Sequence, residues 1–158
     1  MENPSHIRLR LLAGLIGLSV IALVLAACAP AATPTPAPST TITGIVWQWI
    51  SVTDQSTQVT TVVPNSENYT IVFNTDGTFT GKADCNNIAG TYSQTNGFSI
   101  KLGPSTLAFC GEASLDTQYL QLLSNVAAGG PDGAGGLALE TAGGAQRMLF
   151  RNAGAAPQ

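Results

Sequence analysis

The chain has 158 residues, of which 44% are apolar and only 9% carry charge, and its formal net charge is −3. A chain of this length holds one compact domain with a core of moderate size. Because no basic patch is present, nucleic acid is excluded as an expected partner.

The chain opens with the pattern of an exported lipoprotein. Two basic residues, Arg8 and Arg10, precede an apolar run that ends in Leu-Ala-Ala and then Cys28. A basic start, an apolar stretch and small residues at the cleavage point define a secretory signal, and the cysteine resembles that of a bacterial lipobox. We expect a signal peptide over residues 1–27 and a diacylglyceryl group on Cys28 that anchors the protein extracytoplasmically to a membrane of the cell envelope. The alternative is an uncleaved helix of about 17 residues, which can just span a bilayer.

The only histidine, His6, would be removed with this signal peptide. A Ser-His-Asp or Cys-His device needs an imidazole to take and return a proton. Ordinary zinc sites need histidines or several thiolates. We therefore expect no enzyme, no metal site and no cofactor.

A tether follows the lipid-bearing cysteine. Residues 28–43 are rich in proline, alanine and threonine, a composition that favours extended polyproline II geometry over folding. At ~3.1 Å per residue the tether would hold the domain up to roughly 40 Å from the lipid surface.

Short strands are predicted from residue 44 to residue 102, where apolar and polar residues alternate. Trp47 and Trp49 share one face of the first run, so we expect them in the core rather than on an exposed aromatic platform. Asp-Gly and Asn-Gly pairs supply tight turns. The spacing predicts an antiparallel meander.

One α-helix is predicted over about residues 114–127, where leucines and a tyrosine recur at helical intervals and Asp116 lies in the first turn. The glycine-rich run 129–136 ends this helix, and two closing strands complete a β domain over residues 44–152. Residues 153–158 are expected to be a disordered tail. The fold class is mainly β: a small antiparallel β-barrel or a strongly curled meander with one helix.

Two cysteines remain after the anchor, Cys85 and Cys110. An even pair in an oxidising compartment predicts a disulfide, which would close a loop of about 26 residues and add roughly 3.5 kcal/mol of stability in the chain-entropy model. The alternative is two buried free thiols. Because the chain has no Cys-x-x-Cys spacing, we do not expect the pair to be redox-active.

Several motifs recur in a fixed order along the domain. They are F-x-x-D-G-x-F-x-G from Phe73 to Gly81, A-D-C-N from Ala83 to Asn86 and T-L-A-F-C-G-E from Thr106 to Glu112. Over most of residues 44–152 the chain resembles the META domain family, which includes HslJ-type heat-shock proteins. The resemblance implies a barrel-like β domain with one helix and an association with stress response and the envelope. It implies no shared chemical reaction.

Four polar residues flank the cysteine positions: Asp84, Asn86, Glu112 and Asp116. They could form one binding site or, less simply, a pair of carboxylates for acid/base work. The structural interpretation, which we prefer, is that they serve the local turns and the helix start.

The sequence thus favours a non-catalytic, envelope-anchored lipoprotein that binds another envelope protein or maintains the envelope under stress. One alternative is a small-molecule binding module with a ligand in the barrel mouth. In that case four large residues would decide whether a cavity stays open: Trp47, Tyr92, Phe98 and Phe109. A weaker alternative is an inhibitor of extracellular proteases that presents a disulfide-tied loop.

Overall fold

The computed structural model describes residues 41–157. The expected signal peptide, the expected lipidation site Cys28 and the predicted tether up to residue 40 lie outside the described residues. Within the described range, no helix has the length and apolar character needed to cross a bilayer.

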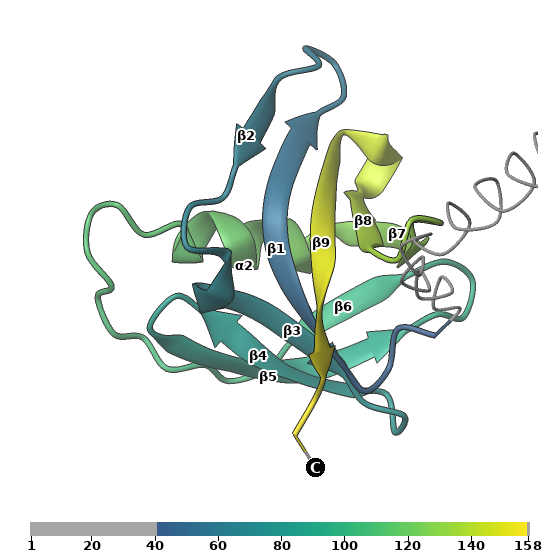
Figure 1. Cartoon of the computed structure of the whole chain (residues 1–158), viewed down its shortest axis with the longest axis horizontal. Helices are drawn as coiled ribbons and strands as arrows, with labels where there is room; N and C mark the ends of the chain where they lie inside the picture. The colour runs from purple at the N-terminus through teal and green to yellow at the C-terminus, as the bar shows by residue number, and fades with distance from the viewer. Residues whose placement is uncertain (1–40, 158) are drawn as a thin grey trace, which may run out of the picture. The chain divides into compact units, whose positions relative to one another are not determined.

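The domain is one antiparallel sheet whose strands follow each other in space in the order β6-β5-β4-β3-β1-β9-β8-β7. The short strand β2 pairs with the C-terminal part of β1. Figure 1 shows β1 and β9 side by side at the centre of this sheet. The strands are β1 (Ile45–Asp54), β2 (Thr60–Val62), β3 (Tyr69–Phe73), β4 (Thr78–Ala83), β5 (Asn86–Ser93), β6 (Ser99–Leu102), β7 (Val126–Pro131), β8 (Leu137–Thr141) and β9 (Gln146–Ala155).

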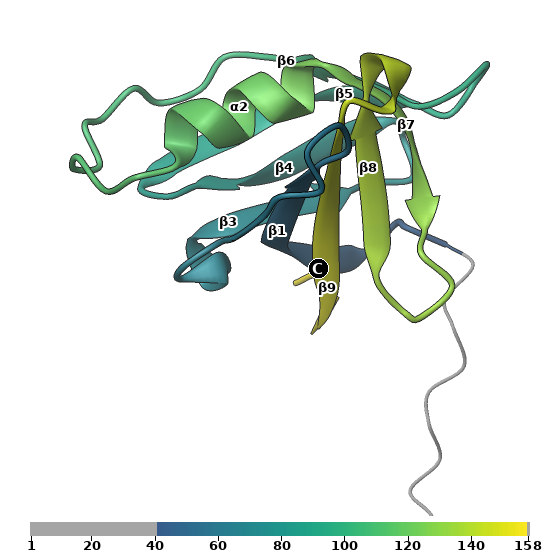
Figure 2. The same ribbon diagram turned by 90° about the horizontal axis from the view of Figure 1, so that it is seen from above.

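The sheet curls until its two edge strands approach one another, as Figure 2 shows. The backbone N–H of Phe98, just before β6, donates to the carbonyl oxygen of Ala127 in β7 at 3.1 Å. This bond nearly closes an eight-stranded barrel and covers edges that would otherwise be open to other chains. The predicted fold class, a small antiparallel barrel with one α-helix, is confirmed.

Helix α2 (Asp116–Ser124) lies across one end of the barrel (Figure 2) and buries Tyr119, Leu122 and Leu123. The Tyr119 ring stacks on the Trp49 ring with centroids 5.1 Å apart. Both predicted core tryptophans are buried, and their indole N–H groups donate to backbone carbonyls. Large side chains therefore fill the barrel interior: Trp47, Trp49, Tyr119, Phe73, Phe79, Phe150, Ile71, Leu123, Leu137, Leu139 and Met148.

The helix is shorter than its predicted span of 114–127, and the segment after it is a strand. Val126 already belongs to β7, which continues through the glycines that we expected only to end the helix. Gly129 permits this pairing, because a Cβ there would lie 2.5 Å from the Leu139 side chain and 3.0 Å from the Ala138 carbonyl oxygen on β8. Glycine allows the two strands to pack closely, which a composition-based interpretation does not detect.

Both ends of the domain extend beyond the predicted boundaries. Ile42, assigned to the tether, is buried in the core, and its carbonyl oxygen accepts the Trp47 indole N–H at 2.8 Å. At the other end β9 continues through Ala155, which pairs with Ile45. The prediction of a disordered tail from residue 153 is therefore wrong for residues 153–155. The added ladder with β1 explains why they are ordered.

Candidate functional site

The site begins at the tight corner between β4 and β5. Asp84 and Cys85 are its two turn residues, since Ala83 pairs directly with Asn86 across the hairpin. Asp84 has a φ of 59°, in the left-handed region that aspartate tolerates better than most residues. The turn places the residues of the A-D-C-N motif next to the long connection that follows β6.

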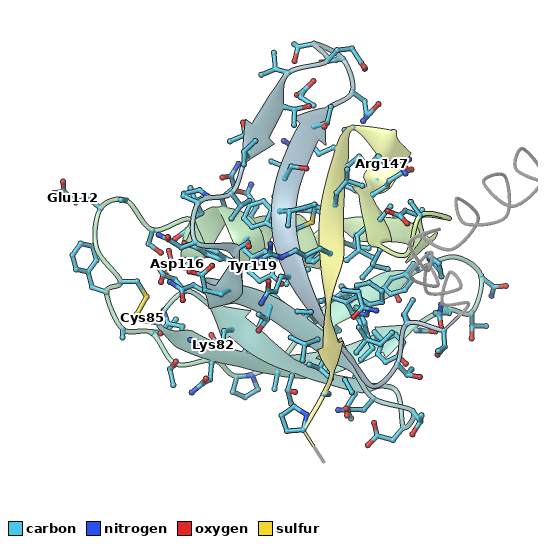
Figure 3. All side chains as sticks on the ribbon, in the orientation of Figure 1. Lys82, Cys85, Glu112, Asp116, Tyr119 and Arg147 are labelled. Atoms are coloured by element: carbon cyan, nitrogen blue, oxygen red, sulfur yellow. A yellow bond between two sulfur atoms is a disulfide. The ribbon has the colours of Figure 1, made fainter. Side chains whose placement is uncertain are left out.

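That connection, residues 103–115, is here called the clasped loop. A disulfide joins Cys85 at the corner to Cys110 in the loop, with 5.6 Å between their Cα atoms. The predicted disulfide is thus confirmed. Figure 3 shows the bridge near the Cys85 label, where it ties the loop to the end of the sheet.

A buried amide holds the same loop from inside. Asn86 is 2% exposed. Its Oδ1 accepts the Ala108 backbone N–H at 2.8 Å, and its Nδ2 donates to the Ala108 carbonyl oxygen at 3.0 Å. Because one side-chain amide reaches both backbone groups of Ala108, they must point the same way, as they do in an extended strand. Asn86 therefore acts as a strand neighbour for the loop.

The end of the loop is fixed by a second set of polar contacts. The Tyr69 hydroxyl donates to the Asp84 carboxylate at 3.2 Å and accepts the Leu115 backbone N–H at 2.8 Å. Asn68 also donates to Asp84, at 3.3 Å. The predicted Asp84 is thus a structural acceptor that positions Tyr69.

Three of the four predicted polar residues, Asn86, Glu112 and Asp116, line one surface pocket at the clasped loop, whereas Asp84 does not. Asn86 contacts Asp116, with 3.4 Å between Nδ2 and Oδ2, while the other Asp116 oxygen accepts the Thr117 backbone N–H. Glu112 is exposed at the outer tip of the loop (Figure 3) and lines the same pocket. Within residues 41–157 no group of three or more histidine, cysteine or acidic side chains could hold a metal ion. The arrangement fits turn and helix-start roles for the two aspartates.

The most exposed large apolar side chains of the described residues lie on the clasped loop. Leu107 is 89% exposed and Phe109 is 84% exposed. Sequence reasoning missed Leu107, and it offered Phe109 as a side chain of the barrel mouth, which is wrong because that ring lies outside the barrel. The only signal was the alternation of small and large residues in T-L-A-F-C, which suits an exposed loop and a buried strand equally.

One buried tyrosine has no polar partner. The Tyr119 hydroxyl is buried without a hydrogen bond within the described residues. This burial raises the pKa of Tyr119 well above its ordinary value. The group lies inside the packed aromatic cluster, so it is not available to a substrate.

Comparisons with known proteins define the type of domain. The family model described as META domain matches residues 40–154. A search of curated proteins finds no match. Two solved structures are similar at 15% identity. A DUF4847 family protein from Bacteroides vulgatus has a TM-score of 0.52 and covers 70% of this chain and 93% of its own. A protein from Burkholderia xenovorans has a TM-score of 0.55 and covers 80% of this chain and 97% of its own. At this identity the likeness shows the fold alone.

Proposed function

We propose that this chain, which belongs to the META domain family, is a non-catalytic envelope lipoprotein that binds another envelope protein through its clasped loop. The lipid anchor follows from the lipobox-like Cys28. Protein binding follows from the loop. The two features together suit a domain that meets its partner at a membrane surface and supports the envelope under stress.

The absence of catalysis rests on how the polar groups are used. The chain has no histidine after His6, so no imidazole is available for nucleophilic catalysis. Asp84 and Asp116 bind the Tyr69 hydroxyl and the start of α2. These carboxylates are committed to the fold rather than presented together to a substrate.

The exposed and pre-ordered loop is the observation that carries this proposal. Leu107 and Phe109 present large apolar groups to solvent, whereas Asn86 and the disulfide fix the backbone that bears them. Binding costs less entropy when a loop is already ordered. Large anchor side chains also supply most of the energy of protein interfaces.

The filled interior favours this function over a small-molecule binding module. Trp47 and Phe98, two of the residues expected to decide the question, are buried within the barrel. A ligand in the barrel mouth would have to displace packed aromatic side chains. We therefore retain protein binding as the function.

Position-specific crosslinking in the native envelope tests the proposal. A photo-crosslinking amino acid at position 107 of the lipidated protein should capture one discrete partner. The same amino acid at position 62 should not capture it, although Val62 is 73% exposed. Equal capture from both positions, or none from position 107, would refute binding through the loop.

The anchor has a separate test. Mass spectrometry of the purified protein should find a diacylglyceryl thioether on Cys28, and Cys28→Ser should release the domain from the membrane fraction. An unmodified Cys28 thiol would remove the lipoprotein part of the proposal without affecting the loop.

A further inference from the structure

The clasped loop has one bonded edge and one free edge. Thr106 and Ala108 turn their backbone N–H groups inward, to the Asn87 carbonyl oxygen and to Asn86 Oδ1. In an extended chain the groups of alternate residues point to opposite edges. The backbone N–H and C=O groups of Leu107 and Phe109 accordingly have no hydrogen-bond partner within residues 41–157. A second strand could pair with this free edge.

Leu107 is held on both sides although its own side chain is free. Before it, the Thr106 hydroxyl donates to Asn86 Oδ1 at 3.0 Å. After it, the same oxygen accepts the Ala108 N–H at 2.8 Å. Cys110, three residues beyond Leu107, is bonded covalently to the sheet corner. The peptide bond between Leu107 and Ala108 therefore lies at the centre of an exposed segment that is fixed on both sides.

Serine endoproteases bind their substrates in this form. The cleft adds an extended peptide as a strand, and one side chain enters a specificity pocket beside the catalytic serine. We infer that the clasped loop is an inhibitory loop for a serine endoprotease with an apolar specificity pocket, and that Leu107 occupies this pocket. The inference rests on the proposed protein-binding role of the loop, and it names the class of partner.

The same contacts account for inhibition rather than digestion. In attack, the serine oxygen bonds to the Leu107 carbonyl carbon, the bond to the Ala108 nitrogen breaks, and the serine proton passes through the protease histidine to that nitrogen. In an ordinary substrate the released amine diffuses away. Here Asn86 and the disulfide keep the Ala108 amine beside the acyl carbon, so the reverse reaction re-forms the peptide bond faster than water hydrolyses the acyl group.

The test uses the full lipidated chain in detergent against two proteases with different pockets. Chymotrypsin has an apolar pocket, whereas trypsin has an aspartate that selects lysine and arginine. We expect competitive inhibition of chymotrypsin with the loop intact and no inhibition of trypsin. Leu107→Lys should reverse this preference, with a change in the inhibition constants of about 30-fold or more, the effect of a hot-spot side chain.

Two controls separate the loop from the rest of the surface. Val62→Lys changes an exposed apolar residue on β2 and should leave both inhibition constants unchanged. Reduction of the disulfide should convert the inhibitor into a substrate that is cut after Leu107.

Three outcomes would overturn the inference: no inhibition of chymotrypsin, rapid cleavage of the oxidised loop, or a Leu107→Lys protein with unchanged preference. If crosslinking from position 107 still captures a partner, protein binding survives and only the protease assignment fails. If neither experiment gives a signal, both proposals fail.

Discussion

Two segments of this domain expose a pair of large apolar side chains, and they are built in different ways. The clasped loop presents Leu107 and Phe109, while the hairpin formed by β1 and β2 presents Val59 and Val62, which are 61% and 73% exposed. Apolar exposure alone therefore does not distinguish a binding segment from a simple surface feature.

The backbone makes the distinction. In the hairpin, β2 pairs with β1 along a regular ladder that includes Ser51 and Val62, and the Val59 carbonyl accepts the Asp54 N–H. The clasped loop has no ladder and is fixed by a disulfide and a buried side chain. Each segment is bonded on one edge only, since β2 pairs with β1 alone. The two segments differ in what fixes them: a backbone ladder in the hairpin, and a covalent bond with a buried amide in the loop. We assign recognition to the loop because its anchored backbone carries the two more exposed side chains.

Removing the disulfide should have the largest effect. Cys85→Ser with Cys110→Ser, or full reduction, should lower the free energy of unfolding by roughly 3.5 kcal/mol for a closed loop of about 26 residues. This corresponds to a fall in melting temperature of about 10–20 °C. Calorimetry with and without reductant measures it. An unchanged melting temperature would mean that the noncovalent contacts alone fix the loop.

Removing the buried amide should have the next largest effect. Asn86→Ala leaves the Ala108 N–H and C=O without their partner. Because Ala108 itself is exposed, water can replace that partner, and the loss is about 0.5–1.5 kcal/mol for each hydrogen bond. Chemical denaturation measures this loss, and hydrogen exchange should show the Ala108 amide exposed. The matched control is Asn87→Ala, because Asn87 is adjacent and its side chain is exposed. Equal losses in both variants would show that Asn86 has no special role.

The sequence predicted the barrel but not what makes the loop a candidate site. Alternation of apolar residues predicts strands and their faces, because burial on one side imposes a period of two. The pairing of Cys85 with Cys110 was predicted from the expected oxidising compartment and from the even number of cysteines after the anchor. The role of Asn86 could not be predicted, because it depends on a loop 22 residues away whose backbone position no local pattern encodes.

The strand β7 was missed for a related reason. Its glycines at 129 and 130 read as a helix stop, but the close contact of Gly129 with Leu139 is a tertiary requirement. Likewise the exposure of Leu107 arises because the disulfide and Asn86 hold the neighbouring backbone. Long-range contacts, not composition, decide which apolar residues stay outside.

Two tyrosine hydroxyls differ in their hydrogen bonds: one bonds to the loop, and the other has no partner within the described residues. Tyr69→Phe removes the acceptor of the Leu115 N–H and should cost about 1 kcal/mol. Tyr119→Phe removes a hydroxyl with no partner and should be close to neutral at pH 7. Denaturation of both variants measures the difference. A larger loss in Tyr119→Phe would contradict this assignment of roles.

Tyr119 also makes the stability of the domain depend on pH in alkali. Burial raises the pKa of Tyr119 in the folded state, so the unfolded chain loses that proton first. Stability should therefore fall as pH rises above about 10, the ordinary tyrosine pKa. Tyr119→Phe removes the share of this loss that Tyr119 contributes and should become more stable than the parent chain in that range, while Tyr92, whose pKa is raised by burial and by the charge of Asp76, keeps its own share. Parallel pH profiles of the two proteins would argue against it.

The smallest effect is expected in the hairpin. Its turn is held by hydrogen bonds to a carboxylate, whereas the clasped loop is held by a disulfide. Hydrogen bonds from the Ser56 hydroxyl and from the Thr57 and Ser56 backbones lower the pKa of Asp54. A carboxyl with a lowered pKa stabilises the folded state above its unfolded pKa of about 3.9, and the contribution is lost as pH falls through the folded value. Acid should thus lower the hydrogen-exchange protection factor of the Thr57 amide, and Asp54→Asn should abolish that pH dependence. Asp76→Asn, at the turn between β3 and β4, is the matched control. Asp76→Asn should leave the pH dependence of exchange at the Thr57 amide unchanged, because each carboxylate bonds only within its own turn.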